Sequence, residues 1–258
     1  MGLSARRIGI VLVGAFVVGL IAFLPAVWFE TRINQALPAP WQVVMRGTVW
    51  DGTGVLRAGK AADSIQVPLT WTFDAASLAT LRAAWNIVPA SSALSGVLKV
   101  GMGLGAVEIG NAVLTLDAAT LARTHPLTAL LAPQGSIDIS TPDGATITLQ
   151  TRDDFRLNGE IRIDAKAFSI RPLGPSLAGD YTANLRTRDS RLAYTLRQPK
   201  GALNLDGTGT IDLPTRTVNY SGLVAPAREL PDALLLQLKS IGKAEPDGRL
   251  RLDWKIQW

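Results

Sequence analysis

The side chains that most often carry chemistry are scarce in this sequence. Its 258 residues include one histidine, His125, and no cysteine. One histidine without thiolates cannot supply the nitrogen and sulfur ligands of a zinc site. A cysteine nucleophile and a disulfide are both excluded. We therefore expect no metal centre and no cofactor.

Two further groupings have the right residue types but the wrong context. Ser240 and Lys243 match the S-x-x-K pattern of penicillin-interacting enzymes, which also need S-D-N and K-T-G elements that this sequence lacks. Asp153 and Asp154 are adjacent, so on a strand they would point to opposite faces and could not act as an acid–base pair. The sequence predicts a protein that is not an enzyme.

The charge distribution does not favour a nucleic-acid partner. The chain has 26 Lys and Arg residues against 21 Asp and Glu residues, a formal net charge of +5. Acidic and basic residues are interleaved through residues 151–200, with no basic run and few aromatic side chains beside them. This pattern is typical of a solvated sheet face, with mild attraction to anionic lipid headgroups as the alternative.

The N-terminus contains a candidate membrane anchor. From Ile8 to Phe29 the chain carries no charged residue, and a helix of that length spans about 33 Å, enough to cross a bilayer. Arg6 and Arg7 before it place residues 1–7 in the cytoplasm by the positive-inside rule, and residues 30–258 in the periplasm. A cleaved signal peptide is the alternative, but its apolar region would be shorter. Pro25 should kink or end the helix.

The rest of the chain has the pattern of antiparallel strands. Apolar and polar residues alternate on both sides of turn signals at Asn158-Gly159, at residues 142–144 and at residues 246–248, which predict hairpins or tight turns. The final segment alternates most regularly and should face a packed core with Leu250, Leu252, Trp254, Ile256 and Trp258.

Helical patterns are few and short. Candidates run from Ala75 to Trp85 after the N-cap Asp74, from Asp117 to Arg123, and from Pro231 to Ile241 before Gly242. The glycines of residues 96–110 follow no phosphate-loop order, and glycines inside strands usually mark bulges. The predicted fold class is therefore mainly β: a curved antiparallel sheet with two or three short helices, preceded by one N-terminal transmembrane helix.

Several segments together resemble a known family. Residues 47–52 read Gly-Thr-Val-Trp-Asp-Gly, Thr70-Trp71 follows, and the order continues through residues 173–181, 201–209 and 234–242. In this order and spacing, after a single anchor, they resemble protein N of the bacterial type II secretion system. Residues 90–110 have no counterpart in that resemblance.

The resemblance implies a non-catalytic accessory component of the cell inner membrane that supports export of folded proteins across the outer membrane. Its implied partners are the bitopic inner-membrane platform proteins, with the outer-membrane secretin as a further candidate. Only Gly47, Trp50 and Gly52 carry over as candidate partner-binding residues. A large aromatic at Trp50 would equally fill the membrane-proximal end of the core.

A second function class is open. A curved sheet with one anchor also resembles envelope proteins of the AsmA-like kind, whose β trough shelters acyl chains. The concave face distinguishes the two: an open apolar trough would suit lipid, and a filled core would suit a scaffold. The regular alternation of the C-terminal strand favours the filled core.

Overall fold

The computed structural model describes residues 16, 18–37, 41–58, 65–103, 107–123, 126–142, 146–149, 155–171, 178–188, 191–212, 215–227 and 232–257. The candidate residues His125, Asp153, Asp154 and Trp258 lie outside these residues.

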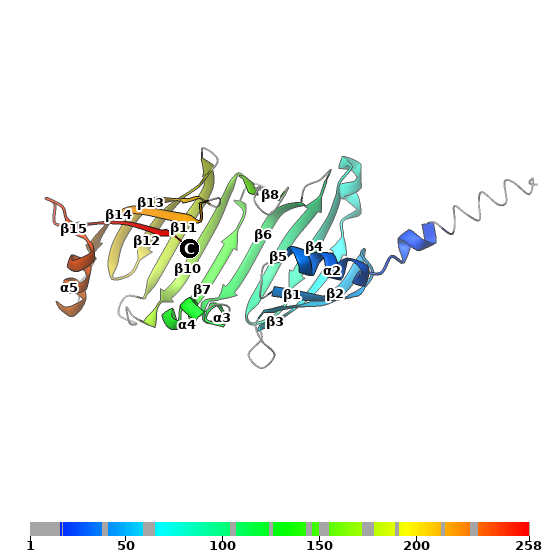
Figure 1. Cartoon of the computed structure of the whole chain (residues 1–258), viewed down its shortest axis with the longest axis horizontal. Coiled ribbons are helices and arrows are strands. Elements are labelled where there is room, and N and C mark those ends of the chain that lie inside the picture. The colour runs from blue at the N-terminus through cyan, green and yellow to red at the C-terminus, as the bar shows by residue number, and fades with distance from the viewer. Residues whose placement is uncertain are drawn as a thin grey trace, which may run out of the picture.

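The described strands form a single antiparallel sheet (Figure 1). Its 16 strands are β1 (Trp41–Gly47), β2 (Asp51–Ala58), β3 (Ile65–Phe73), β4 (Ala83–Pro89), β5 (Leu94–Met102), β6 (Val107–Asp117), β7 (Gln134–Ser140), β8 (Thr146–Leu149), β9 (Phe155–Asn158), β10 (Glu160–Ser169), β11 (Gly179–Arg188), β12 (Arg191–Lys200), β13 (Leu203–Asp212), β14 (Thr217–Pro226), β15 (Lys243–Ala244) and β16 (Leu250–Gln257).

The strand order is almost the chain order. It runs from β1 to β7 and then through β10, β11, β12, β13, β14, β16 and β15, while β8 pairs with β6 and β9. The end strands β1 and β15 do not pair with each other, so the sheet is open. Consecutive antiparallel pairing follows from short connections, which join neighbours more easily than crossovers do. The mainly β, antiparallel fold class is confirmed.

The turn signals are only partly correct. Residues 246–248 do connect a hairpin, because β15 pairs with β16. The hairpin predicted at Asn158-Gly159 is wrong: β9 pairs with β8, and β10 pairs with β7 and β11. Gly159 has a φ of +94° and forms a bend between the end of β9 and the start of β10. At residues 142–144 the hairpin alternative is also wrong, because β7 and β8 both pair with β6. The tight-turn alternative stays a prediction, since residues 143 and 144 lie outside the described residues.

The helices are short, as expected, and differ in extent. A 3₁₀ helix η1 (Ala75–Thr80) begins at the N-cap Asp74, whose carboxylate accepts from the Ala76 amide at 3.1 Å. It ends at Leu81, which has a φ of 56°, so the helix predicted up to Trp85 is too long. The other two predicted helices are found as α3 (Ala118–Leu121) and α5 (Asp232–Ile241), and α4 (Pro126–Leu131) lies between β6 and β7.

The N-terminal segment is interrupted where its proline predicts. Residues 18–22 are helical, Pro25 makes an isolated bridge to Thr48, and a second helix α2 (Val27–Ala36) follows. In the part of the chain that the structure describes, no helix is long and apolar enough to cross a membrane. Residues 8–15 and 17 of the predicted anchor lie outside that part, and the transmembrane helix and the domain limits at residues 7 and 29 stay predictions.

Two clusters of buried hydrophobic residues lie near the two ends of the sheet. One cluster comprises Ala58, Ile65 and Val67 in β2 and β3. The other is built by α5 against β13, β14 and β16, and its members are Ala202, Leu203, Val224, Leu238 and Leu250. Between them the apolar face has no comparable cover among the described residues.

The C-terminal strand β16 is buried only at its beginning. Leu250 is 7% exposed, but Trp254 is 42% and Ile256 is 54% exposed. The prediction that this strand faces a packed core along its length is therefore wrong for its second half. The alternation is correct, but α5 covers only the beginning of β16.

One glycine of β5 marks a bulge. Gly96 has a φ of +128°, and the register between β5 and β6 shifts between Val97 and Lys99. A side chain at Gly96 would collide with the backbone carbonyl of Val113. The interpretation of strand glycines as bulge markers is confirmed at Gly96, whereas Gly101 lies in regular register with Glu108.

Candidate functional site

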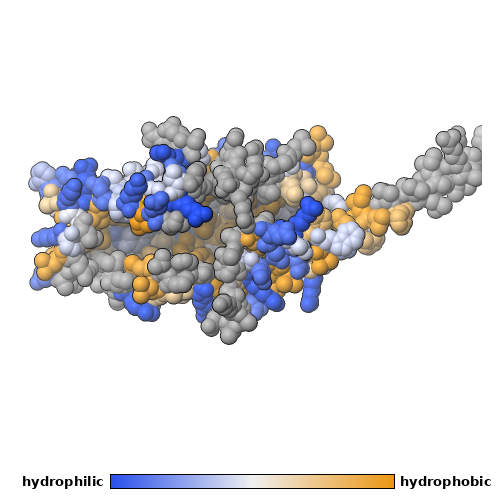
Figure 2. Space-filling view, in the orientation of Figure 1, coloured by the Kyte–Doolittle hydropathy of each residue, from blue (hydrophilic) through white to orange (hydrophobic). Residues whose placement is uncertain are grey.

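The sheet has one apolar face, because the register aligns apolar residues of neighbouring strands. A single row crosses eight strands from β6 to β16, and each member is the register partner of the next. The row is Leu114, Ile139, Ile163, Ala183, Leu196, Gly207, Gly222 and Leu252. Figure 2 looks onto a hollow lined by hydrophobic residues with hydrophilic residues on its rim. This hollowed apolar face is the main candidate for a binding surface.

A pocket of about 370 Å³ lies in this face, over β7, β10, β11 and β12. Its lining is almost entirely apolar and includes aromatic rings at one end, where Phe168 meets Tyr181 edge-on at 6.1 Å between ring centres. The lining residues are Ile137, Ile163, Ala165, Phe168, Ser169, Ile170, Tyr181, Ala183 and Leu196.

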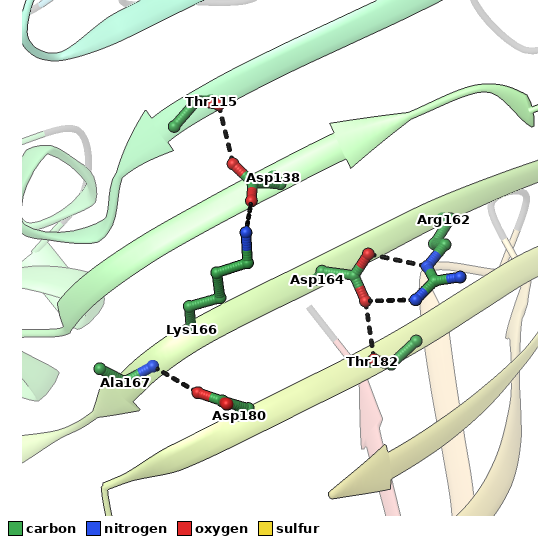
Figure 3. Close-up of polar contacts among 8 residues, drawn as sticks. All are labelled: Thr115, Asp138, Arg162, Asp164, Lys166, Ala167, Asp180 and Thr182. Atoms are coloured by element: carbon green, nitrogen blue, oxygen red, sulfur yellow. Dashed lines mark hydrogen bonds and ion pairs between the residues drawn. The ribbon is translucent and has the colours of Figure 1, made fainter. Parts of the chain in front are cut away.

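A bulge in β10 shapes this pocket. Ala167 has a φ of 48°, and the register of β10 shifts between Ala165 and Phe168. The Ala167 amide donates to the Asp180 carboxylate at 2.9 Å (Figure 3). The extra residue changes which face the following side chains occupy, so Phe168 and Ser169 both line the pocket. The alternation pattern identified the face but carried no sign of this bulge.

An aromatic ladder continues the apolar face toward its C-terminal end. Tyr194 stacks on Tyr220 at 6.4 Å, and Tyr220 stacks on Trp254 at 5.3 Å. Side chains at Gly207 and Gly222 would collide with the Tyr220 ring, so these glycines let that ring lie flat on the sheet. Burial raises the pKa of Tyr194 to about 12 and also raises the pKa of Tyr220. Both shifts favour the protonated phenols, and the rings add packing surface to the apolar face.

The opposite face is charged and solvated (Figure 3). Lys166 pairs with Asp138 at 2.7 Å and Arg162 pairs with Asp164 at 2.7 Å, with both cationic side chains more than half exposed. A hydrogen bond from Lys166 lowers the pKa of Asp138. Partial burial raises the pKa of Asp164, but hydrogen bonds from Arg162 and Thr182 together lower it by more, so its pKa lies below the usual value. These carboxylates are ionised partners of surface ion pairs, which stabilise a fold only weakly.

Residues 47–52 form a compact junction between the N-terminal segment and the sheet. The Trp50 indole N–H donates to the carbonyl of Ile21 at 2.7 Å, and the Val49 amide donates to the carbonyl of Leu24 at 3.0 Å. The Trp50 ring, which is half-buried, meets Phe73 edge-on at 4.8 Å. The segment that precedes the sheet is therefore hydrogen-bonded to the predicted partner-binding turn.

Two other tryptophans form hydrogen bonds to the backbone of the same turn. The Trp71 indole donates to Thr48 at 3.0 Å and the Trp85 indole donates to Val49 at 2.7 Å, in both cases to the backbone carbonyl. Gly47 has a φ of +96°. Gly52 lies under the Trp71 ring, with which any side chain there would collide. The structure thus gives Gly47, Trp50 and Gly52 intramolecular roles at the junction, and their part in binding another protein stays a prediction.

The residues considered for catalysis do not form a site within the described structure. Ser240 lies in the last turn of α5, and Lys243 begins β15 beyond Gly242. Among the described residues no group of three or more His, Cys, Asp or Glu side chains could hold a metal ion.

The fold places the chain among open antiparallel-sheet proteins, and its hollowed apolar face is a candidate binding surface. A family model for protein N of the type II secretion system matches residues 41–253, and the chain belongs to this family. The family is a component of an envelope-associated secretion apparatus and not a known enzyme family. No curated protein and no solved structure shows significant similarity to the chain.

Proposed function

We propose that this protein is an inner-membrane accessory component of the type II secretion apparatus that supports export of folded proteins across the outer membrane. The family match over residues 41–253 is the observation that carries the proposal. In it, residues 8–29 anchor the chain, residues 1–7 lie in the cytoplasm and residues 30–258 lie in the periplasm.

The junction at residues 47–52 supports an anchored arrangement. Its hydrogen bonds to Ile21 and Leu24 leave no long flexible linker between the apolar segment and the sheet. A rigid junction would hold the sheet at a set height above the bilayer, where bitopic platform proteins and, as a further candidate, the secretin could contact it. Gly47, Trp50 and Gly52 lie at that height and are the proposed partner-binding residues.

The proposal is tested by deleting the gene and measuring how much of a folded substrate reaches the medium. We expect substrate to accumulate in the periplasm and wild-type protein to restore secretion. Reporter fusions after Lys60 test the topology: a periplasmic reporter should be active there and a cytoplasmic reporter silent. Normal secretion in the deletion strain would contradict the secretion role, whereas a mature N-terminus near residue 30 would contradict only the anchor.

A second candidate function is the sheltering of acyl chains on the apolar face, as in AsmA-like proteins. The pocket of about 370 Å³ and the exposed Trp254 and Ile256 favour it, because an apolar face of this kind is seldom left uncovered in a soluble protein. The test is mass spectrometry of lipid that co-purifies with the detergent-solubilised chain. Ala183→Trp should fill the pocket and reduce bound lipid, and Thr195→Trp, at an exposed site on the opposite face of β12, should not. Equal lipid in both variants, or none in wild type, would exclude this function.

A further inference from the structure

The two edges of the sheet are treated differently. The outer edge of β1 is covered by α2: the Asn34 side chain exchanges two hydrogen bonds with the Val43 backbone, at 2.7 and 3.0 Å. The Glu30 carboxylate accepts from the Met45 amide at 2.9 Å, and the Gly47 carbonyl accepts from the Ala26 amide at 3.0 Å. Outward backbone groups of Val43, Met45 and Gly47 are thus paired with α2 and the residue before it, which occupy the place where a further strand would add.

The edge at β16 is open over most of its length. Its outer neighbour β15 pairs only at Ala244 with Leu250 and at Lys243 with Arg251. Beyond Arg251, no described strand lies on that side of β16. Backbone groups on one edge of a strand recur every second residue, so those of Asp253 and Lys255 point outward beside Arg251. An exposed edge of this kind is a template for another strand.

We propose that this edge pairs with the same edge of a second copy of the chain, antiparallel and centred on Trp254. In this register Asp253 lies opposite Lys255 of the partner subunit, twice by symmetry, so both charge pairs are attractive. Leu252 lies opposite Ile256 of the partner subunit, and apolar residues meet on the apolar face. The paired segment runs only from Leu252 to Ile256, because Arg251 is already paired with Lys243 of β15. The residues are self-complementary, as a two-fold interface requires.

The neighbouring registers are unfavourable for a physical reason. Centring on Lys255 places two Lys255 side chains opposite each other, and centring on Asp253 does the same with two carboxylates. Like charges directly opposite are destabilising. Because α2 blocks the other edge, head-to-tail growth into a filament is unavailable, and the assembly closes as a dimer.

The aromatic ladder adds an independent argument for an occupant at this edge. Tyr194, Tyr220 and Trp254 stack across β12, β14 and β16, and the ladder stops at Trp254, which is 42% exposed. In the proposed register the two Trp254 rings become neighbours, the ladder continues into the second copy and the two hollowed apolar faces join.

Disulfide trapping in the full chain tests the register, since the sequence has no cysteine to interfere. Trp254→Cys should cross-link to itself under mild oxidation in detergent, because facing residues at such a position lie about 4.5 Å apart between Cα atoms, within disulfide range. Ile256→Cys is the matched control on the same face, and it should not cross-link, because it faces Leu252 of the partner subunit. The pair Leu252→Cys with Ile256→Cys should cross-link.

Charge reversal tests the contacts without altering the core. Asp253→Lys and Lys255→Asp should each weaken self-association about tenfold, measured as the dimer fraction by light scattering. An equimolar mixture of the two variants should regain the dimer, because each lysine then faces an aspartate. A monomeric wild-type chain, cross-linking of Ile256→Cys as efficient as that of Trp254→Cys, or capture of a different protein by Trp254→Cys in cells would overturn the proposal.

Discussion

Gly52→Ala should destabilise the protein through the Trp71 ring. An added Cβ would lie 2.5 Å from the Arg46 carbonyl oxygen and closer still to the indole. The ring is 6% exposed and is held by its hydrogen bond to Thr48 at 3.0 Å, so neither neighbour can move away freely. Overpacking of this kind costs about 1–3 kcal/mol.

The matched control is Gly101→Ala, near the end of β5. The nearest atom to an added Cβ there is 3.8 Å away, an ordinary contact. Replacing a glycine at a compatible position should stabilise the chain by about 0.4–1 kcal/mol by restricting the unfolded state. The two variants should therefore shift the unfolding midpoint in opposite directions.

The assay is urea or thermal unfolding of the full chain in detergent, with tryptophan fluorescence and circular dichroism as the recorded signals. Loss of about 2 kcal/mol corresponds to roughly 4–8 °C for a protein of this size. A double-mutant cycle with Trp71→Leu isolates the ring: Gly52→Ala should cost less in that background. The reasoning is refuted if Gly52→Ala is as stable as wild type, or if its cost is unchanged without the indole.

Two further predictions concern the strand β16 and the ion pair between Lys166 and Asp138. Leu250→Ala should cost about 2–5 kcal/mol because its side chain is buried against α5, while Trp254→Ala should cost much less because its ring is already 42% exposed; equal unfolding midpoints would contradict this. Because Lys166 lowers the pKa of Asp138 in the folded state, the ion pair stabilises the fold above about pH 4 and its contribution is lost as the pH falls through that lowered pKa. Asp138→Asn should therefore be less stable at neutral pH and match wild type in acid, whereas a pH-independent difference would argue against the pairing.

Much of the local structure could be predicted because strand alternation is a property of neighbouring residues. The C-terminal alternation, the N-cap at Asp74 and the interruption at Pro25 depend on the pleat, on one carboxylate and on one missing amide. The hairpin prediction at Asn158-Gly159 is wrong because the same dipeptide suits both a hairpin turn and a bend between two successive strands that do not pair with each other. Only the pairing of β9 with β8 distinguishes them.

The sequence by itself determined the fold class, the family and the two faces of the sheet, because these follow from short-range periodicity and from the order of segments along the chain. Only the tertiary structure decided what covers those faces and edges. Whether Trp254 is buried depends on how far α5 reaches along β16, and whether β1 can accept a strand depends on Asn34 in α2. Such contacts join elements that are separate in the chain, and no local pattern of residues contains them.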